Sequence, residues 1–183
     1  KEPATIRLQV LNKKGIALQK QRKHRDATQA FQETLATYRG LEDRWKQDLD
    51  VAAFSAVAES HFNIGEVQLE EARAIKFDSR NDKAIAKAVA DKGRLLDRVT
   101  TTFKDVIGYG HPGWVIAAST QAGLAYQDFA DTIEGAPVPT NIQNDPDASE
   151  VYIQDMAAKS TSFRQLALVF YRNALETARK ERW

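Results

Sequence analysis

The sequence contains no cysteine, which excludes disulfide bonds and any chemistry that depends on a thiolate. It also lacks an excess of either charge, because 26 Lys and Arg residues face 25 Asp and Glu residues, for a formal net charge of +1. Such a balance gives no overall field that would attract nucleic acid or an anionic membrane. No apolar run approaches the roughly 18 residues that span a bilayer, and no signal peptide is visible.

Proline is scarce and clustered. Three of the five prolines lie between Gly135 and Asp147, a stretch that is long for a loop. Elsewhere apolar residues recur at three- and four-residue steps, the period of an amphipathic helix, and no strand pattern competes. Hydrophobic residues make up 43% of the chain, which is enough to build a core. We therefore expect an all-α fold.

Six helices are expected. The sharpest break between them is at Gly108, Gly110 and Pro112, because glycine accepts left-handed backbone and proline does not continue a helix. Asn81 or Asp82 is expected to cap the helix that follows a polar turn. The expected helices cover about residues 4–22, 26–45 (continuous, or restarting after residue 40), 49–77, 83–107, 112–134 and 149–183.

The two ends of the sequence suggest an excerpt from a longer chain. It begins at Lys1-Glu2-Pro3, and it stops at Trp183 within a helical pattern. We expect further repeats of the same chain to lie beyond this segment.

Motifs for catalysis or metal binding are missing. His24, His61 and His111 are the only histidines, and none has a second ligand at a helical spacing. The patterns HExxH, GxSxG, GxxxxGK and GxGxxG do not occur. The basic run from Lys20 to Arg25 could hold an anion, but cations near the carboxyl end of a helix are more simply a solvated turn. We expect a protein that is not an enzyme and that binds no cofactor or metal.

An internal repeat organises the chain. In the segment Ala58–Gly65 an apolar residue precedes a small one, and the same pattern recurs at Ala118–Gly123. A looser copy runs from Leu11 through Gly15 to Leu18, with Lys14 in place of the apolar residue. Glycine inside a helix costs about 1 kcal/mol relative to alanine. A glycine kept at this point therefore indicates that a paired helix comes close.

The second helix of each pair has its own signature, in which an aromatic residue follows a small or β-branched one by four positions. The three copies are Ala27/Phe31/Leu35, Val99/Phe103/Ile107 and Ala167/Tyr171/Leu175. The glycines Gly15, Gly65 and Gly123 are 50 and 58 residues apart (65 − 15 and 123 − 65), longer than the roughly 34 of a standard tetratricopeptide repeat. The second pair must therefore have lengthened helices, and the third contains the proline-rich loop.

These patterns resemble the tetratricopeptide repeat (TPR), with a glycine in the first helix and an alanine–aromatic step in the second. A narrower resemblance rests on FNIGE at 62–66 and on the stretch from Val106 to Pro139, whose Ala136–Pro139 part is its most distinctive feature. Over about residues 50–183 the chain is similar to the large envelope-associated TPR proteins of myxobacteria and their relatives, including those of adventurous gliding motility. This resemblance implies a protein-interaction scaffold on the periplasmic side of a cell envelope, with the cytoplasm as the alternative.

The fold class expected from these patterns is all-α. Three antiparallel helical hairpins, at about 4–47, 49–108 and 112–183, would stack as a TPR-like right-handed α-solenoid within one domain, 1–183. The first helix of each hairpin would line a concave surface.

The function expected is non-catalytic binding of a partner protein or peptide through that concave surface. The mixture of amides, carboxylates and apolar groups on this surface suits an extended or helical peptide. We expect neither nucleic-acid binding nor membrane insertion. The resemblance assigns the groove-facing positions to Gln9, Asn12, Ile16, Gln19, Glu59, Phe62, Glu66, Leu69, Ala117, Thr120, Leu124 and Gln127.

Two other interpretations remain. In one, the chain is a ligand carrier or helical enzyme, with a polar pocket under the Gly135–Asp147 loop that uses Tyr126 and Asp128. In the other, it is a plain structural spacer with no preferred groove, and Phe62 and Leu124 are simply core residues.

Overall fold

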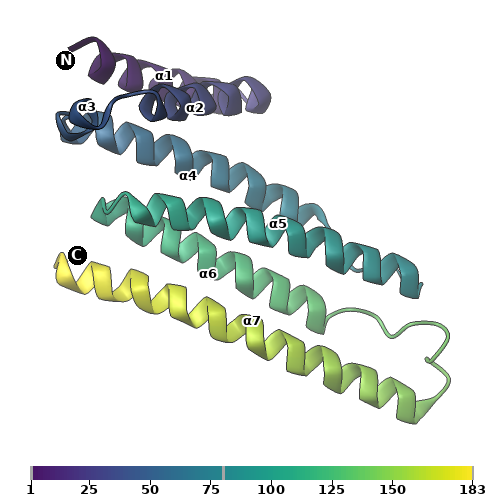
Figure 1. Ribbon diagram of the computed structural model, residues 1–183. Coiled ribbons are helices and arrows are strands. Elements are labelled where there is room, and N and C mark those ends of the chain that lie inside the picture. The colour runs from purple at the N-terminus through teal and green to yellow at the C-terminus, as the bar shows by residue number, and fades with distance from the viewer. Residues whose placement is uncertain (1, 80, 183) are drawn as a thin grey trace.

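The computed structural model describes residues 2–79 and 81–182, so Lys1, Arg80 and Trp183 lie outside the described residues. Within those ranges the chain forms helices and no strand (Figure 1). The helices are α1 (Glu2–Lys20), α2 (His24–Arg39), α3 (Asp43–Gln47), α4 (Val51–Ala74), α5 (Asp82–Gly108), α6 (Pro112–Glu134) and α7 (Pro146–Lys180). The all-α prediction is confirmed. The described chain has seven helices, one more than predicted, because the segment after Gly40 restarts as the short helix α3.

Capping side chains determine where three of the long helices begin. The carboxylates of Asp50 and Asp145 accept the backbone N–H of Ala53 at 2.7 Å and of Ala148 at 3.1 Å. Asn81 accepts the N–H of Ala84 at 3.1 Å, so the predicted cap is Asn81. Each cap satisfies a donor that the first turn of the helix leaves free.

The start of α7 and the end of α4 were predicted wrongly. Helix α7 starts at Pro146, three residues before the predicted start, since proline is well suited to the first turn behind the cap Asp145. Helix α4 ends at Ala74, whereas apolar spacing had extended it to residue 77. Phe77 is buried all the same, but it packs into the core from the link that follows the helix.

The helices pair in chain order. Helices α1 and α2, α4 and α5, and α6 and α7 pack as hairpins, and each later hairpin rests on the one before it (Figure 1). The first helix of each later hairpin contacts both preceding helices: α4 packs against α1 and α2, and α6 packs against α4 and α5. We call α1, α4 and α6 the first helices, and α2, α5 and α7 the second helices.

Each hairpin is closed by one glycine and one aromatic ring. A Cβ atom built on Gly15 would lie 2.4 Å from the Phe31 ring, and one on Gly65 would lie 2.6 Å from the Phe103 ring. A Cβ atom on Gly123 would lie 2.4 Å from the ring of Tyr171. No side chain larger than hydrogen fits at these points without displacing the ring. The three pairs define a common register, in which positions are counted from the glycine in a first helix and from the aromatic residue in a second helix.

Two apolar clusters form the core, and α4 contributes to both. The smaller cluster lies between the first hairpin and the amino-terminal half of α4, around Phe31 and Val57. The larger one joins the carboxyl-terminal part of α4 to α5 and α6, around Leu69 and Phe103, with α7 residues such as Phe163 packed against it.

Candidate interaction surface

Six of the twelve groove candidates form two regular rows on the first helices. Six residues before each glycine stand Gln9, Glu59 and Ala117, and one residue after each glycine stand Ile16, Glu66 and Leu124. All six side chains are half-buried. We call these two rows the candidate face. Its members can still contact a partner.

The row three residues before each glycine lies deeper, because neighbouring first helices meet along it. Asn12 is 0% exposed, and its Nδ2 donates to Ser60 Oγ of α4 at 3.0 Å. Phe62 packs against Phe103 and Trp114, with ring centroids 5.6 and 5.3 Å away. Thr120, the third member, is half-buried. Asn12 is therefore wrongly placed on the groove, since its amide pins α1 to α4.

The row four residues after each glycine is divided between core and surface. Gln19 is half-buried and Gln127 is exposed, but Leu69 is 2% exposed within the larger apolar cluster. Leu69 is therefore also wrongly placed on the groove, because α6 covers it. Spacing from the glycines predicts which residues share a row on the first helices. It does not predict how far the next hairpin covers that row.

Three acceptor atoms on the first helices are buried without a hydrogen-bond partner among the described residues: Asn12 Oδ1, Glu66 Oε1 and Gln121 Oε1. Burial raises the pKa of Glu66, Arg73 opposes that shift, and Glu70 adds to it. An acceptor that is hidden from water and unpaired costs free energy. Sequence reasoning missed Gln121, which no recognised motif marks.

His61 is buried among packing partners. Its ring is buried, Nδ1 lies 3.2 Å from Tyr109 Oη, and Nε2 lies 3.9 Å from Asp105 Oδ2. Burial lowers the pKa of His61 against the opposing effect of Asp105, while burial raises the pKa of Tyr109 to about 12. Among the described residues, no group of three His, Cys, Asp or Glu side chains could hold a metal ion.

The pocket beneath the Gly135–Asp147 loop differs from the polar one predicted for a carrier. Tyr126 stacks on Phe163 and Phe170, and Asp128 pairs with Lys92 of α5, its Oδ2 lying 2.7 Å from the ammonium nitrogen. Asp128 lines an open hollow of about 360 Å³ at the start of the loop, together with Asp131, Thr132 and Gly135. Neither Tyr126 nor Asp128 lines the hollow that Pro139 of the loop covers. The hollow under Pro139 measures about 380 Å³ and is mainly apolar, lined by Ile85, Ala86, Val89, Ile133, Pro139, Tyr152, Met156 and Lys159.

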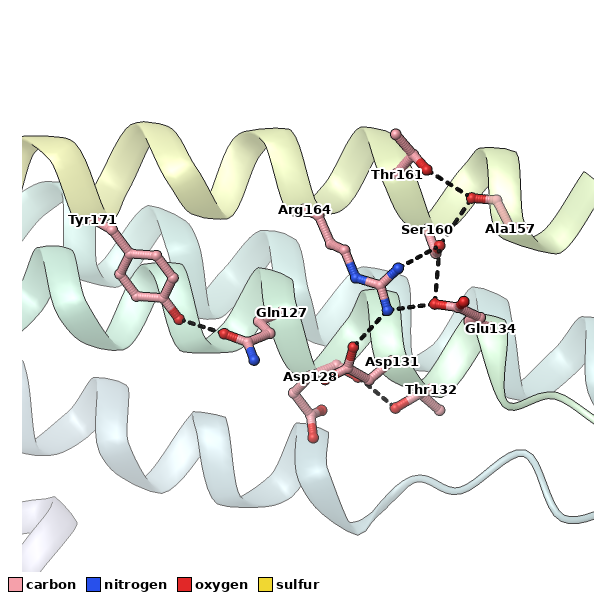
Figure 2. A network of polar contacts seen from close by, with 10 residues as sticks. All are labelled: Gln127, Asp128, Asp131, Thr132, Glu134, Ala157, Ser160, Thr161, Arg164 and Tyr171. Carbon is pink, nitrogen blue, oxygen red and sulfur yellow. Dashed lines mark hydrogen bonds and ion pairs between the residues drawn. The ribbon is translucent and has the colours of Figure 1, made fainter.

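A polar network joins α6 to α7 along the last hairpin (Figure 2). Arg164 of α7 donates from Nη2 to Asp131 Oδ1 at 2.9 Å, pairs with Glu134, and donates from Nη1 to Ser160 Oγ at 3.3 Å. Farther along α7, Tyr171 Oη donates to Gln127 Oε1 at 2.9 Å. Sequence reasoning identified Tyr171 and Gln127 in separate rows, and it missed the Arg164 network because the partners lie about 30 residues apart in sequence.

None of the helices in the described ranges combines the length and apolarity needed to cross a membrane. Comparison of the chain with protein-family models, with curated proteins and with solved structures gives no match.

Proposed function

We propose that this protein is a non-catalytic interaction scaffold, a TPR-like α-solenoid whose candidate face binds a segment of a partner protein. The observation that carries the proposal is the common register of the three hairpins. The same glycine–aromatic contact closes each of them, at Gly15/Phe31, Gly65/Phe103 and Gly123/Tyr171. Equivalent residues of α1, α4 and α6 therefore recur along the stack, as they do in solenoids that bind extended ligands.

The chemistry of the candidate face favours a peptide over a small polar metabolite. It presents apolar groups at Ile16 and Leu124 beside the carboxylates of Glu59 and Glu66. The carboxylates of the face accept hydrogen bonds, and the backbone N–H groups of a bound segment are suitable donors. Lys13 already pairs with Glu59 at 3.6 Å, so a bound cation would compete with it there.

Photo-cross-linking in the source cells tests the assignment of the face. A photoreactive amino acid is introduced singly at Ile16, Glu66 or Leu124, and at the control positions Gln29 and Thr101, which are exposed on the second helices. We expect the three first-helix positions to yield the same cross-linked partner and the two controls to yield none.

A second readout links the adduct to the binding surface. Leu124→Glu is expected to reduce the adduct formed from Ile16, because the charge is introduced into a row that should contact the same partner, whereas Thr101→Glu should leave it unchanged. A partner captured from Gln29 or Thr101, but not from the first helices, contradicts the assignment.

We propose the periplasmic side of a cell envelope as the compartment, because the sequence resembles envelope-associated proteins.

A second candidate function rests on the apolar hollow beneath the Gly135–Asp147 loop. A volume of about 380 Å³ lined by Val89, Ile133 and Met156 suits an apolar ligand or a single apolar side chain. Saturable binding of a fluorescent apolar probe that is lost in Val89→Trp would favour a carrier. An unchanged signal in that variant would remove this candidate.

A further inference from the structure

The hollow under Pro139, which we call the loop hollow, forms where α5 and α7 extend past the end of α6 (Figure 1). Helix α6 ends at Glu134 and contributes only Ile133 to the lining. The walls come from the first two turns of α5 and from the amino-terminal part of α7, and the loop covers the space between them. The loop hollow is therefore enclosed by elements that pack on one another inside the stack.

The walls of the loop hollow are held in place without a ligand. Ile133 is 4% exposed, and the side chains of Val89 and Met156 pack against the larger apolar cluster. On the side of the loop, the backbone N–H of Gln143 donates to the carbonyl oxygen of Pro139 at 3.0 Å. A ligand would therefore enter a space that is already formed, which lowers the entropic cost of binding.

The volume of the loop hollow decides between a single apolar side chain and a small molecule. A cavity of about 150 Å³ holds one benzene-sized group, which is the size of a phenylalanine ring. One side chain would therefore leave more than half of the 380 Å³ unfilled. The volume lies instead at the lower end of the range for small-molecule sites, roughly 300–1,000 Å³. One acyl chain of medium length suits this space, and the two chains of a membrane lipid exceed it.

A cation stands at the mouth of the loop hollow. Of the described residues that line it, only Lys159 is charged. The Lys159 side chain is 55% exposed, and its Nζ lies 2.6 Å from Oδ2 of Asp155, one turn earlier on α7. An exposed pair of this kind contributes little to stability because water screens it, so another anion can compete for the ammonium. The lining therefore favours a ligand with an apolar body and one acidic head.

We infer that the loop hollow binds a medium-chain fatty acid, with the acyl chain among the apolar side chains and the carboxylate on the ammonium of Lys159. This inference rests on the second candidate function and specifies its ligand. Asp155 competes with the carboxylate of the ligand for the same ammonium, so this aspartate limits the affinity. None of the six residues of the candidate face lines the loop hollow, so the fatty acid and a partner protein would occupy separate sites.

Isothermal titration calorimetry with decanoate and with the uncharged decanol tests the inference. Decanoate should bind the wild type about tenfold more tightly than decanol, as expected for one hydrogen bond to a charged group. Lys159→Met should lower the affinity for decanoate about tenfold and leave the affinity for decanol unchanged. The matched control is Lys87→Met, which removes an exposed cation of α5 that does not line the loop hollow. It should leave both affinities unchanged.

Two further variants separate the acidic head from the apolar body. Asp155→Asn frees the ammonium of Lys159 from its partner, so decanoate should bind several-fold more tightly while decanol binds as before. Val89→Trp fills the loop hollow and should abolish the binding of both compounds. Circular dichroism and urea unfolding check that each variant is folded. Lys159 and Asp155 are both more than half exposed, so the fold should tolerate their replacement.

The possible outcomes separate this inference from the function on which it rests. Equal affinities of the wild type for decanoate and decanol, or an unchanged preference in Lys159→Met, would overturn the fatty-acid inference and leave a carrier of neutral apolar ligands. If neither compound binds up to its solubility limit, the second candidate function is wrong as well. Neither result bears on the candidate face, whose test is the cross-linking experiment.

Discussion

At the scale of single residues, the glycines of the first helices determine how closely the two helices of each hairpin can pack. Phe103, opposite Gly65, is 0% exposed and enclosed by the larger cluster, so its ring has nowhere to move. Tyr171, opposite Gly123, is only half-buried on the last helix. Replacing the glycine should therefore cost more stability in the second hairpin than in the third.

Gly65→Ala is predicted to lower the free energy of unfolding by about 1–2 kcal/mol, since overpacking of about 1–3 kcal/mol exceeds the gain in helix propensity. Gly123→Ala should cost less, because the Tyr171 ring can give way. Gly108→Ala is the control: its new Cβ would meet nothing within 4 Å, and the change should be neutral or stabilising by up to about 1 kcal/mol. Urea unfolding measures all three, and a Gly65→Ala protein more stable than wild type would contradict the close contact.

His61 makes stability depend on pH. Its pKa in the folded protein lies below the value of 6.5 for a free side chain, mainly because of burial. As pH falls through about 6.5, the unfolded chain takes up a proton that the folded chain resists, so the contribution of His61 to stability is lost on acidification. The difference in unfolding free energy between wild type and His61→Gln should therefore shrink between about pH 8 and pH 5. A difference that stays constant or grows would show that Asp105 outweighs burial.

At the scale of elements, one buried cation connects α5 to α6. Lys92 is 1% exposed, and its Nζ donates to Thr132 Oγ1 at 2.9 Å and to the carbonyl oxygen of Ile75 at 3.3 Å, besides its pair with Asp128. Every hydrogen of this ammonium therefore has an acceptor, which offsets the cost of burying it.

Lys92→Met is predicted to destabilise the protein by about 2–3 kcal/mol, below the range for fully buried pairs, since Asp128 keeps contact with solvent. The double variant Lys92→Met/Asp128→Leu should recover part of that loss, because no carboxylate is then left without its partner. Urea unfolding of the two single variants and the double variant gives the coupling energy. A coupling energy near zero would mean that Lys92 acts only by filling space.

The helices and their pairing could be predicted from the sequence because they depend on local signals. The caps and the break at Gly110, with its φ of +72°, lie within a few residues of the boundaries that they set. The members of each glycine–aromatic pair were likewise predicted in separate helices. The short helix α3 has no buried residue, so no periodic apolar pattern marked it as a separate element.

The burial of the candidate residues could not be predicted, since it depends on the next hairpin. Leu69 and Gln127 occupy the same register position, yet α6 covers the first and nothing in the described chain covers the second. The Arg164 network and the buried Lys92 also join positions on different helices. A single sequence shows which face of a helix is apolar, but not how far a neighbour extends across it.

At the scale of the whole molecule, the two apolar clusters should not have equal stability. The first hairpin touches the rest mainly through α4, with one further ring contact between Tyr38 of α2 and Tyr109 at the end of α5. Its cluster contains fewer buried residues than the one around α5 and α6. In a stack where each hairpin contacts only its neighbours, stability is close to a sum over hairpins and their interfaces. The first hairpin is therefore expected to open at a lower free energy than α5 and α6, as a separate unit.

Native-state hydrogen exchange at low denaturant tests this expectation. Amides of α1 and α2 should exchange through openings that cost less free energy than those of α5 and α6. Phe31→Ala removes the ring that packs on Gly15, a change that typically costs about 3–5 kcal/mol for a buried phenylalanine. It should accelerate exchange in α1, α2 and the amino-terminal half of α4, while α6 keeps its wild-type protection because it belongs to the other cluster. If protection instead falls by the same amount throughout the chain, the stack unfolds as one cooperative unit and α4 transmits the full loss from one cluster to the other.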